Sequence, residues 1–140
     1  MEYNPYALTG KTILVTGASS GIGRAVAIEC SRLGAHVILS ARNKEKLEET
    51  LKMMEGHGHQ VIECDLSKEK EVSLLIDEVP EIQGLVNNAG TTMTVPVPFI
   101  KFNVLSDLLK VNTIAPIMIL SGLVKKKNCL LYTSPSPRDA

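Results

Sequence analysis

The stretch ILVTGASSGIGRA, residues 13–25, joins an apolar segment to three glycines whose spacing suits a phosphate ligand. Gly17 allows the backbone to turn sharply after the apolar segment, and Gly21 has no Cβ that would keep a phosphate away from the backbone. Gly23 lets the helix that follows pack closely against a sheet. Because backbone N–H groups at the start of a helix attract phosphate, we expect this stretch to hold the pyrophosphate of a nucleotide.

Two serines inside the same stretch extend its chemistry. The hydroxyls of Ser19 and Ser20 can reach a phosphate or a ribose. The glycine spacing is G-x-x-x-G-x-G, which differs from the G-x-G-x-x-G of other dinucleotide-binding turns. No Lys-Ser or Lys-Thr pair follows the last glycine, which excludes a P-loop. A glycine-rich turn without a ligand remains the alternative.

The segments around this stretch alternate between short apolar runs and helical periodicity. Strands are expected over residues 12–16, 35–40, 60–64 and 84–88, and helices from about residue 22, after the N-caps Asn43 and Ser67, and over about 106–123. Such alternation is typical of a parallel sheet covered on both faces. With right-handed crossovers, it predicts a Rossmann-type, doubly wound α/β sheet with strand order 3-2-1-4, truncated after its fourth strand.

Three further motifs follow in order on the expected elements: CDL at residues 64–66, NNAG at 87–90 and VN at 111–112. With TGASSGIG, they make residues 8–127 resemble the N-terminal part of the short-chain dehydrogenase/reductase family, most closely its 3-oxoacyl-[acyl-carrier-protein] reductase-like members. The resemblance implies an NAD(P)-dependent oxidoreductase that transfers hydride between its cofactor and a carbonyl or alcohol. The substrate implied for the full-length parent is a small-molecule or acyl-thioester carbonyl, and the parent is expected to be a homo-oligomer.

The resemblance also implies which residues contact the cofactor. They are Gly17, Ser19, Ser20, Gly21, Ile22, Gly23, Asp65, Leu66, Asn87, Ala89 and Gly90. Asp65 is expected to contact the adenine amino group, with capping of the next helix as its structural alternative. Asn87 is expected to brace neighbouring strands, while Ala89 and Gly90 leave room for the cofactor.

The end of the second strand indicates which nicotinamide cofactor is bound. An acidic residue there would bond the ribose 2′-hydroxyl of NAD and repel the 2′-phosphate of NADP. This chain has Ser40-Ala41-Arg42 instead, and an arginine can pair with a phosphate through two parallel hydrogen bonds. We therefore predict NADP(H), with NAD less favoured. A solvated arginine before a surface helix is the structural alternative for Arg42.

Pro116 lies inside the last helical pattern and has no N–H for the carbonyl of Asn112, four residues earlier. The helix should therefore kink and leave that carbonyl free for another partner. In the family that this chain resembles, the matching asparagine is catalytic, because its carbonyl holds a water of a proton relay. A kink that serves packing alone is the alternative.

The acid that would complete carbonyl reduction is not found in this sequence. The family uses a tyrosine, a lysine four residues later and a serine, but none of Tyr3, Tyr6 and Tyr132 has a lysine at that spacing. We therefore expect an inactive cofactor-binding fragment. A non-catalytic dinucleotide-binding or regulatory module is the alternative.

The composition limits the other function classes. Fifteen basic and fifteen acidic residues give zero net charge, which does not favour nucleic-acid binding. No apolar run approaches the length of a membrane span, and no export signal is evident, so a cytoplasmic protein without a membrane partner is expected. The cysteines and histidines lack metal-binding spacing. Residues 1–128 are interpreted as an incomplete NAD(P)-binding Rossmann domain, and residues 129–140, with two Ser-Pro pairs, as a non-native or disordered tail.

Overall fold

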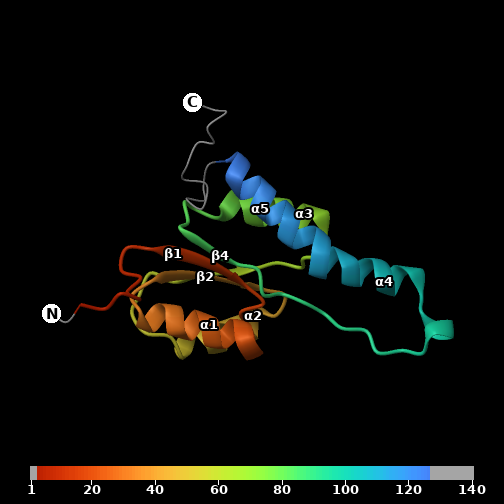
Figure 1. The fold of residues 1–140 in the computed structure, drawn as a ribbon, viewed down its shortest axis with the longest axis horizontal. Helices are drawn as coiled ribbons and strands as arrows, with labels where there is room; N and C mark the ends of the chain where they lie inside the picture. The colour runs from red at the N-terminus through yellow and green to blue at the C-terminus, as the bar shows by residue number, and fades with distance from the viewer. Residues whose placement is uncertain (1–2, 127–140) are drawn as a thin grey trace.

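The computed structural model describes residues 3–126, which form one parallel sheet with helices on both faces (Figure 1). The strands are β1 (Thr12–Thr16), β2 (His36–Ala41), β3 (Gln60–Glu63) and β4 (Gly84–Val86), and the helices are α1 (Gly21–Arg32), α2 (Lys44–Lys52), α3 (Glu69–Glu78), α4 (Phe102–Leu109) and α5 (Ala115–Lys125). A 3₁₀ turn covers Val97–Phe99, and a π-helical segment, Lys110–Ile114, joins α4 to α5. The expected tail, residues 129–140, lies outside the described residues.

The strand order is β3-β2-β1-β4 and every pairing is parallel, which confirms the predicted topology. In the register, Thr16 at the end of β1 lies opposite Ser40 near the end of β2. Val86 at the end of β4 lies opposite Val15. The segments that follow these strands therefore leave the sheet at the same edge, which brings the glycine stretch, Arg42 and the NNAG motif together.

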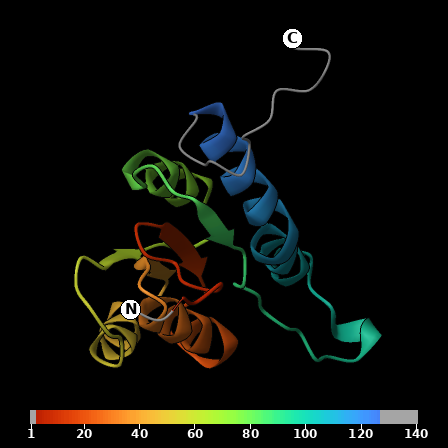
Figure 2. The same cartoon turned by 60° about the vertical axis from the view of Figure 1, so that its left-hand side comes forward.

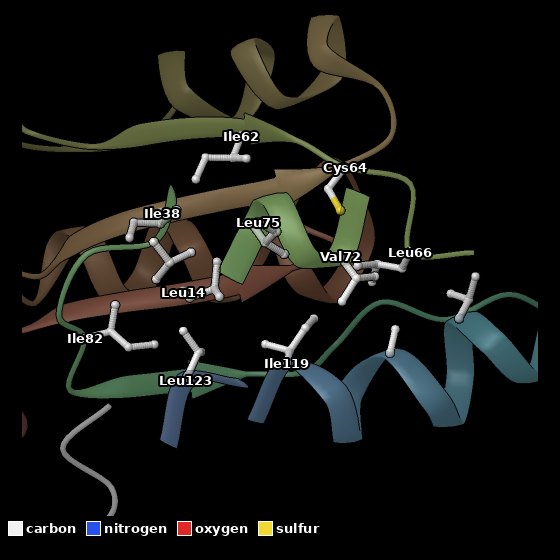
Figure 3. Packing of buried hydrophobic residues seen from close by; sticks show 13 residues of the cluster. Leu14, Ile38, Ile62, Cys64, Leu66, Val72, Leu75, Ile82, Ile119 and Leu123 are labelled. Atoms are coloured by element: carbon white, nitrogen blue, oxygen red, sulfur yellow. The ribbon is translucent and has the colours of Figure 1, made fainter. Parts of the chain in front are cut away.

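Two apolar clusters hold the helices on the sheet, one on each face (Figures 1 and 2). Side chains alternate along β1, so Leu14 packs toward α3 and α5, while Ile13 and Val15 pack toward α1 and α2. Figure 3 shows Leu14 and Ile38 on one side of the first cluster, with Leu75 and Ile119 reaching them from the helices. Because both faces are covered, β1 and β2 read as continuous apolar runs in the sequence.

The starts of two helices test the expected N-caps. Asn43 caps α2, since its side chain accepts a hydrogen bond from the backbone N–H of Lys46 at 3.1 Å, as predicted. The expectation for α3 is wrong, because its N-cap is Lys68 and no side chain bonds there. The Ser67 hydroxyl donates instead to the Asp65 carboxylate, at 2.7 Å.

The last helical region is longer than expected and runs from Phe102 to Lys125. Its 24 residues include an 18-residue window of mean hydropathy 1.5, which is long and apolar enough to cross a membrane by length and composition. The expectation that no apolar run reaches this length is therefore wrong. The expected helix, about residues 106–123, already included Pro116, and the structure adds residues at both of its ends, from Phe102 and to Lys125. The same helix packs on the sheet through Val111, Ala115, Ile119 and Leu123.

His59 supports the start of β2 through its ring. Its Nδ1 accepts a hydrogen bond from the backbone N–H of Val37 at 3.1 Å, and its Nε2 lies 2.6 Å from the carbonyl oxygen of Glu55. Because Nδ1 accepts a hydrogen bond, the proton of the neutral ring lies on Nε2, which donates to that carbonyl. The ring therefore satisfies a backbone N–H just before the β2–β3 ladder begins at Ile38.

His59→Leu is expected to lower the free energy of unfolding by about 1–3 kcal/mol, because the buried N–H of Val37 loses its acceptor. Urea unfolding followed by circular dichroism measures the change. His57→Leu is the matched control, since His57 is exposed and makes no hydrogen bond within residues 3–126, and its loss should cost less than about 0.5 kcal/mol. Equal losses in the two variants would contradict this role of His59.

Candidate functional site

A cavity of about 900 Å³ opens at the edge of the sheet where the strands end. Its lining comes from residues within four connecting segments, 17–20, 40–46, 63–66 and 88–91, and from Val111 on the long helix. Each of the first four segments directly follows or ends one strand. The volume lies in the range of pockets that hold small molecules and cofactors.

The structure brings some of the predicted residues to this cavity and leaves others beside it. The predicted residues that line it are Gly17, Ser19, Ser20, Arg42, Leu66, Ala89 and Gly90. The predicted residues that do not line it are Gly21, Ile22, Gly23, Asp65, Asn87 and Asn112. Ile22 is 74% exposed on the first turn of α1, so nothing in the described fold packs against most of its side chain.

The glycine turn leaves space for a ligand at one residue and none at another. A Cβ on Gly23 would collide with the carbonyl oxygen of Gly17, which explains why the start of α1 packs so closely on the turn. Gly21 has φ 56°, and a Cβ there would meet no atom within 4 Å outside its chain neighbours and its own helix turn. Ser20 is the N-cap of α1 but makes no side-chain capping bond. The turn therefore presents an open backbone and a free hydroxyl at a helix start, which suits a pyrophosphate.

The NNAG motif is fixed to the glycine turn by a buried hydroxyl. The Thr16 hydroxyl accepts from the backbone N–H groups of Asn88 and Ala89, both at 3.1 Å, and donates to the carbonyl of Val86 at 3.4 Å. The Asn88 side chain also donates to the carbonyl of Gly17, at 3.4 Å. Thr16 and Asn88, which sequence reasoning missed, thus join the ends of β1 and β4. The polar Thr16 at the end of an apolar strand was the available signal.

Asn87 does not brace neighbouring strands, contrary to expectation. Its side-chain amide donates to the carbonyl of Pro116 at 3.4 Å and so connects β4 to α5. Successive side chains after a strand point to opposite sides, which gives the two asparagines different partners. The bracing role between β1 and β4 belongs to Asn88.

Asp65 closes a tight turn before α3. One carboxylate oxygen accepts from both the backbone N–H and the hydroxyl of Ser67, at 3.0 and 2.7 Å. Partial burial acts to raise the pKa of Asp65, but the Ser67 hydrogen bonds and the positive charges of Lys68 and Arg42 outweigh it, so the pKa lies below its ordinary value. The Asp65 carboxylate therefore stays charged and is held by the turn that it forms with Ser67. This turn directly precedes α3, whereas the structural alternative for Asp65 was a cap on that helix.

The side chain of Asn112 clamps the segment that follows the NNAG motif. Its oxygen accepts from the backbone N–H of Thr91, and its amide donates to the Thr91 carbonyl, both at 2.7 Å. Asn112 lies in the π-helical segment, where the N–H of Ala115 reaches back to the carbonyl of Lys110. The helix is therefore irregular at the expected position. Sequence reasoning considered the carbonyl of this residue and missed its side-chain clamp.

Two buried polar side chains lie at the inner wall of the cavity. Ser40 is 1% exposed, and its hydroxyl has no hydrogen-bond partner within residues 3–126. Burial, helped by the negative charges of Glu71 and Asp65, raises the pKa of Cys64 to about 12. Cys64 is therefore a neutral thiol rather than a nucleophile. Ser40 lines the cavity, so its unpaired hydroxyl fits a polar ligand there.

The β2–α2 connection carries the positive charge of the site. Arg42, Lys44 and Lys46 all line the cavity. Arg42 makes no ion pair with any described residue, so its guanidinium is available to a ligand. Glu45 and Glu63 also line the cavity, so its lining carries both positive and negative charges. Among the described residues, no three His, Cys, Asp or Glu side chains gather as metal ligands would.

Known proteins share both the sequence and the fold of this chain. A family model described as short chain dehydrogenase matches residues 11–128. The 3-oxoacyl-[acyl-carrier-protein] reductase of Rickettsia felis is 45% identical over 85 residues, and the mouse 3-ketodihydrosphingosine reductase is 43% identical over 101 residues. A solved metagenomic short-chain oxidoreductase in complex with NADP superposes with a TM-score of 0.75 at 33% identity.

These matches cover most of this chain but only part of the relatives. The two reductases match 61% and 64% of this chain, which spans 35% and 30% of their own length. The solved oxidoreductase matches 86% of this chain and 59% of its own. The family model's match, residues 11–128, includes the glycine turn and all four strands, and the predicted resemblance is confirmed. The chain belongs to the short-chain dehydrogenase family.

Proposed function

We propose that this chain binds NADP(H) as the cofactor-binding part of an oxidoreductase. The observation that carries the proposal is the unpaired guanidinium of Arg42 at the rim of the cavity, where β2 ends without an acidic residue at Ala41. A relative of known structure is in complex with NADP, which supports the same cofactor here. When bound, NADP(H) supplies the hydride that is exchanged with a carbonyl or alcohol.

The cavity suggests a division of roles among the residues. The glycine turn, with Ser19, Ser20 and Gly21, would hold the pyrophosphate, and Arg42 would pair with the 2′-phosphate. Ser40 and Leu66 would line the cavity wall beside the adenosine half. Asn112 would position the segment after the NNAG motif through its side chain and hold a relay water through its carbonyl.

The chain should bind the cofactor without completing the reaction. Its sequence has no tyrosine followed four residues later by a lysine, the pair that the family uses as acid. We propose that a longer parent protein supplies this acid and reduces a small-molecule or acyl-thioester carbonyl. The exposed apolar side chains Ile117 and Met118 on α5 support a homo-oligomeric parent. Since the apolar helix Phe102–Lys125 packs on the sheet through one face, we propose a cytoplasmic location without a nucleic-acid or membrane partner.

A non-catalytic dinucleotide-binding or regulatory module is the second candidate, and the missing acid favours it. The two candidates share the same cavity and the same cofactor. Reading the source DNA past the codon of Asn128 separates them. A continuing frame with a Tyr-x-x-x-Lys motif supports the fragment, whereas a native stop codon found in independent clones supports the module.

Cofactor titration tests the proposed binding directly. NADPH added to the purified chain is expected to show saturable, one-to-one binding by its fluorescence, and NADH should bind about ten times more weakly or worse, because it lacks the charged phosphate. NADPH should stay unoxidised when ketone or 3-oxoacyl thioester substrates are added. Failure to bind either cofactor would refute the proposal, and equal binding of both would refute its NADP(H) part.

A further inference from the structure

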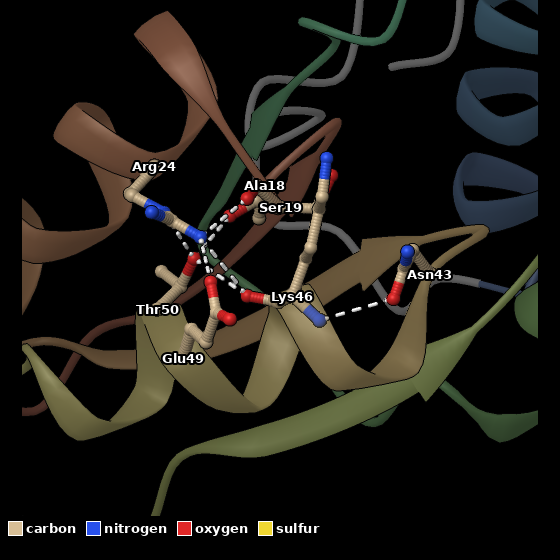
Figure 4. A network of polar contacts seen from close by, with 7 residues as sticks. All are labelled: Ala18, Ser19, Arg24, Asn43, Lys46, Glu49 and Thr50. Carbon is tan, nitrogen blue, oxygen red and sulfur yellow. Dashed lines mark hydrogen bonds and ion pairs between the residues drawn. The ribbon is translucent and has the colours of Figure 1, made fainter.

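Arg24, in the first turn of α1, makes contacts that connect the glycine turn to α2. Its Nε donates to the hydroxyl of Thr50 at 2.9 Å, and its Nη2 donates to the carbonyl of Ser19 at 2.7 Å. The same Nη2 lies 3.2 Å from the Lys46 carbonyl and 3.3 Å from the Glu49 carboxylate. Figure 4 shows the guanidinium between the turn and the helix, with these partners around it.

Thr50 completes the connection from the side of α2. It is fully buried at 0% exposure, and its hydroxyl donates to the carbonyl of Ala18 at 2.8 Å while it accepts from Arg24. The guanidinium of Arg24 thus donates to a hydroxyl that is buried away from water. Together the two side chains bind the carbonyls of Ala18 and Ser19, two consecutive residues of the turn.

These two carbonyl bonds also set the direction of the next two backbone N–H groups. In a planar trans peptide, the C=O and the following N–H point in opposite directions. With the carbonyls of Ala18 and Ser19 held toward α2, the N–H groups of Ser19 and Ser20 point away from Arg24. Both serines line the cavity. The Arg24–Thr50 pair therefore orients donors that a pyrophosphate would use.

The pair also sets where the positive end of the cavity lies. Arg24 bonds the Lys46 carbonyl in the first turn of α2, directly after the segment with Arg42. Arg42 and Lys46 line the same cavity as the glycine turn. A lysine could not replace Arg24, because one ammonium lacks the planar fork that reaches the hydroxyl and the carbonyls together.

We propose that Arg24 and Thr50 are positioning residues for NADPH, which fix the spacing between the pyrophosphate-binding turn and the 2′-phosphate-binding segment. The inference rests on the proposed function, which places the pyrophosphate of NADPH at the glycine turn and its 2′-phosphate at Arg42. Neither residue lines the cavity, so neither would touch the cofactor. Their effect would pass through the turn carbonyls and the first turn of α2.

Thr50→Val and Thr50→Ser in the full chain provide the first test. Valine has the shape of threonine without the hydroxyl, whereas serine keeps the hydroxyl. We expect Thr50→Val to weaken NADPH binding about tenfold and Thr50→Ser to bind within about twofold of the unaltered chain, as one lost hydrogen bond predicts. Circular dichroism at the titration temperature confirms that only folded protein is compared. Equal NADPH affinity of the two variants would overturn the proposal.

Arg24→Met provides the second test, with Arg32→Met as its matched control. Arg32 is on the same helix and forms exposed ion pairs with Glu29 and Glu55. We expect Arg24→Met to weaken NADPH binding about tenfold or more and to weaken NADH binding less, while Arg32→Met changes neither. A lower unfolding midpoint with unchanged NADPH affinity would show a structural role only and overturn the proposal.

A double variant tests whether Arg24 acts through Arg42 or contributes to NADPH binding independently of it. If Arg24 acts partly through the segment that carries Arg42, Arg24→Met combined with Arg42→Ala should lose less NADPH affinity than the product of the two single losses. Losses that multiply would overturn the proposed spacing role. If the unaltered chain binds neither NADPH nor NADH, the proposed function and this inference both fail. If the unaltered chain binds NADPH and all Arg24 and Thr50 variants bind it equally, only this inference fails.

Discussion

Arg42→Asp is expected to weaken NADPH binding by about 100-fold while NADH binding changes little. The guanidinium at the end of β2 has no ion-pair partner among residues 3–126, so a 2′-phosphate can take both of its parallel donors. Loss of such charge-assisted bonds costs about 1.5–3 kcal/mol, and a carboxylate would also repel the phosphate. The same carboxylate can accept a hydrogen bond from the ribose 2′-hydroxyl of NADH.

Fluorescence titration of both cofactors at two salt concentrations measures this change. Arg32→Asp has the same change of charge on the far end of α1, beside Glu29 and Glu55, and it should leave both affinities unchanged. The preference for NADPH over NADH should fall at higher salt in the unaltered chain, because the phosphate contact is exposed. NADPH affinity that is the same in Arg42→Asp and in the unaltered chain would remove Arg42 from the site.

Burial on both faces explains why the strands could be predicted from the sequence. Ile13 and Val15 pack toward α1, while Leu14 packs toward α3, so β1 needs apolar residues at successive positions. That pattern, with helical periodicity between the runs, indicates a doubly wound sheet before any contact is known. The predicted bounds of β1, residues 12–16, match the structure because Gly17 turns the chain with φ 65°.

The partners of the polar side chains could not be predicted in the same way. Asn87 and Asn88 have identical chemistry, and only the fold decides that Asn88 reaches Gly17 while Asn87 reaches Pro116. The clamp between Asn112 and Thr91 joins residues on two separate segments, and no local periodicity indicates it. The expected helix, about residues 106–123, already included Pro116, but its earlier start at Phe102 and the π-helical segment before Pro116 were not indicated by the periodicity.

The connection between Arg24 and Thr50 has the same origin. Helical periodicity places Thr50 near the buried side of α2, beside Leu47, but it does not reveal a hydroxyl bonded to the glycine turn. Arg24 reads as an ordinary charged residue next to a glycine motif. Its guanidinium becomes informative only when α1 and α2 lie side by side on one face of the sheet. Sequence reasoning thus found the ligand-facing turn, and the structure adds what holds it in place.

Gly21→Ala is expected to reduce NADPH affinity by about 10-fold to 100-fold while the chain stays folded. Apart from its chain neighbours and the backbone of its own helix turn, no atom of the described residues lies within 4 Å of the position that a Cβ would take there, so the methyl group has room in the protein. It would occupy the space in front of the turn, where the pyrophosphate must approach the backbone. The positive φ of 56° adds strain of about 1–2 kcal/mol for a residue with a side chain.

Gly10→Ala separates that strain from the loss of ligand space. Gly10 has φ 78° and also meets no atom within 4 Å, but it precedes β1 at the opposite end of the sheet from the cavity. Both variants should therefore lose similar free energy of unfolding in urea, and only Gly21→Ala should lose NADPH affinity. Equal NADPH affinity in the two variants would mean that the open space at Gly21 does not face the cofactor. A large loss in Gly10→Ala would show instead that strain at either turn disturbs the site through the sheet.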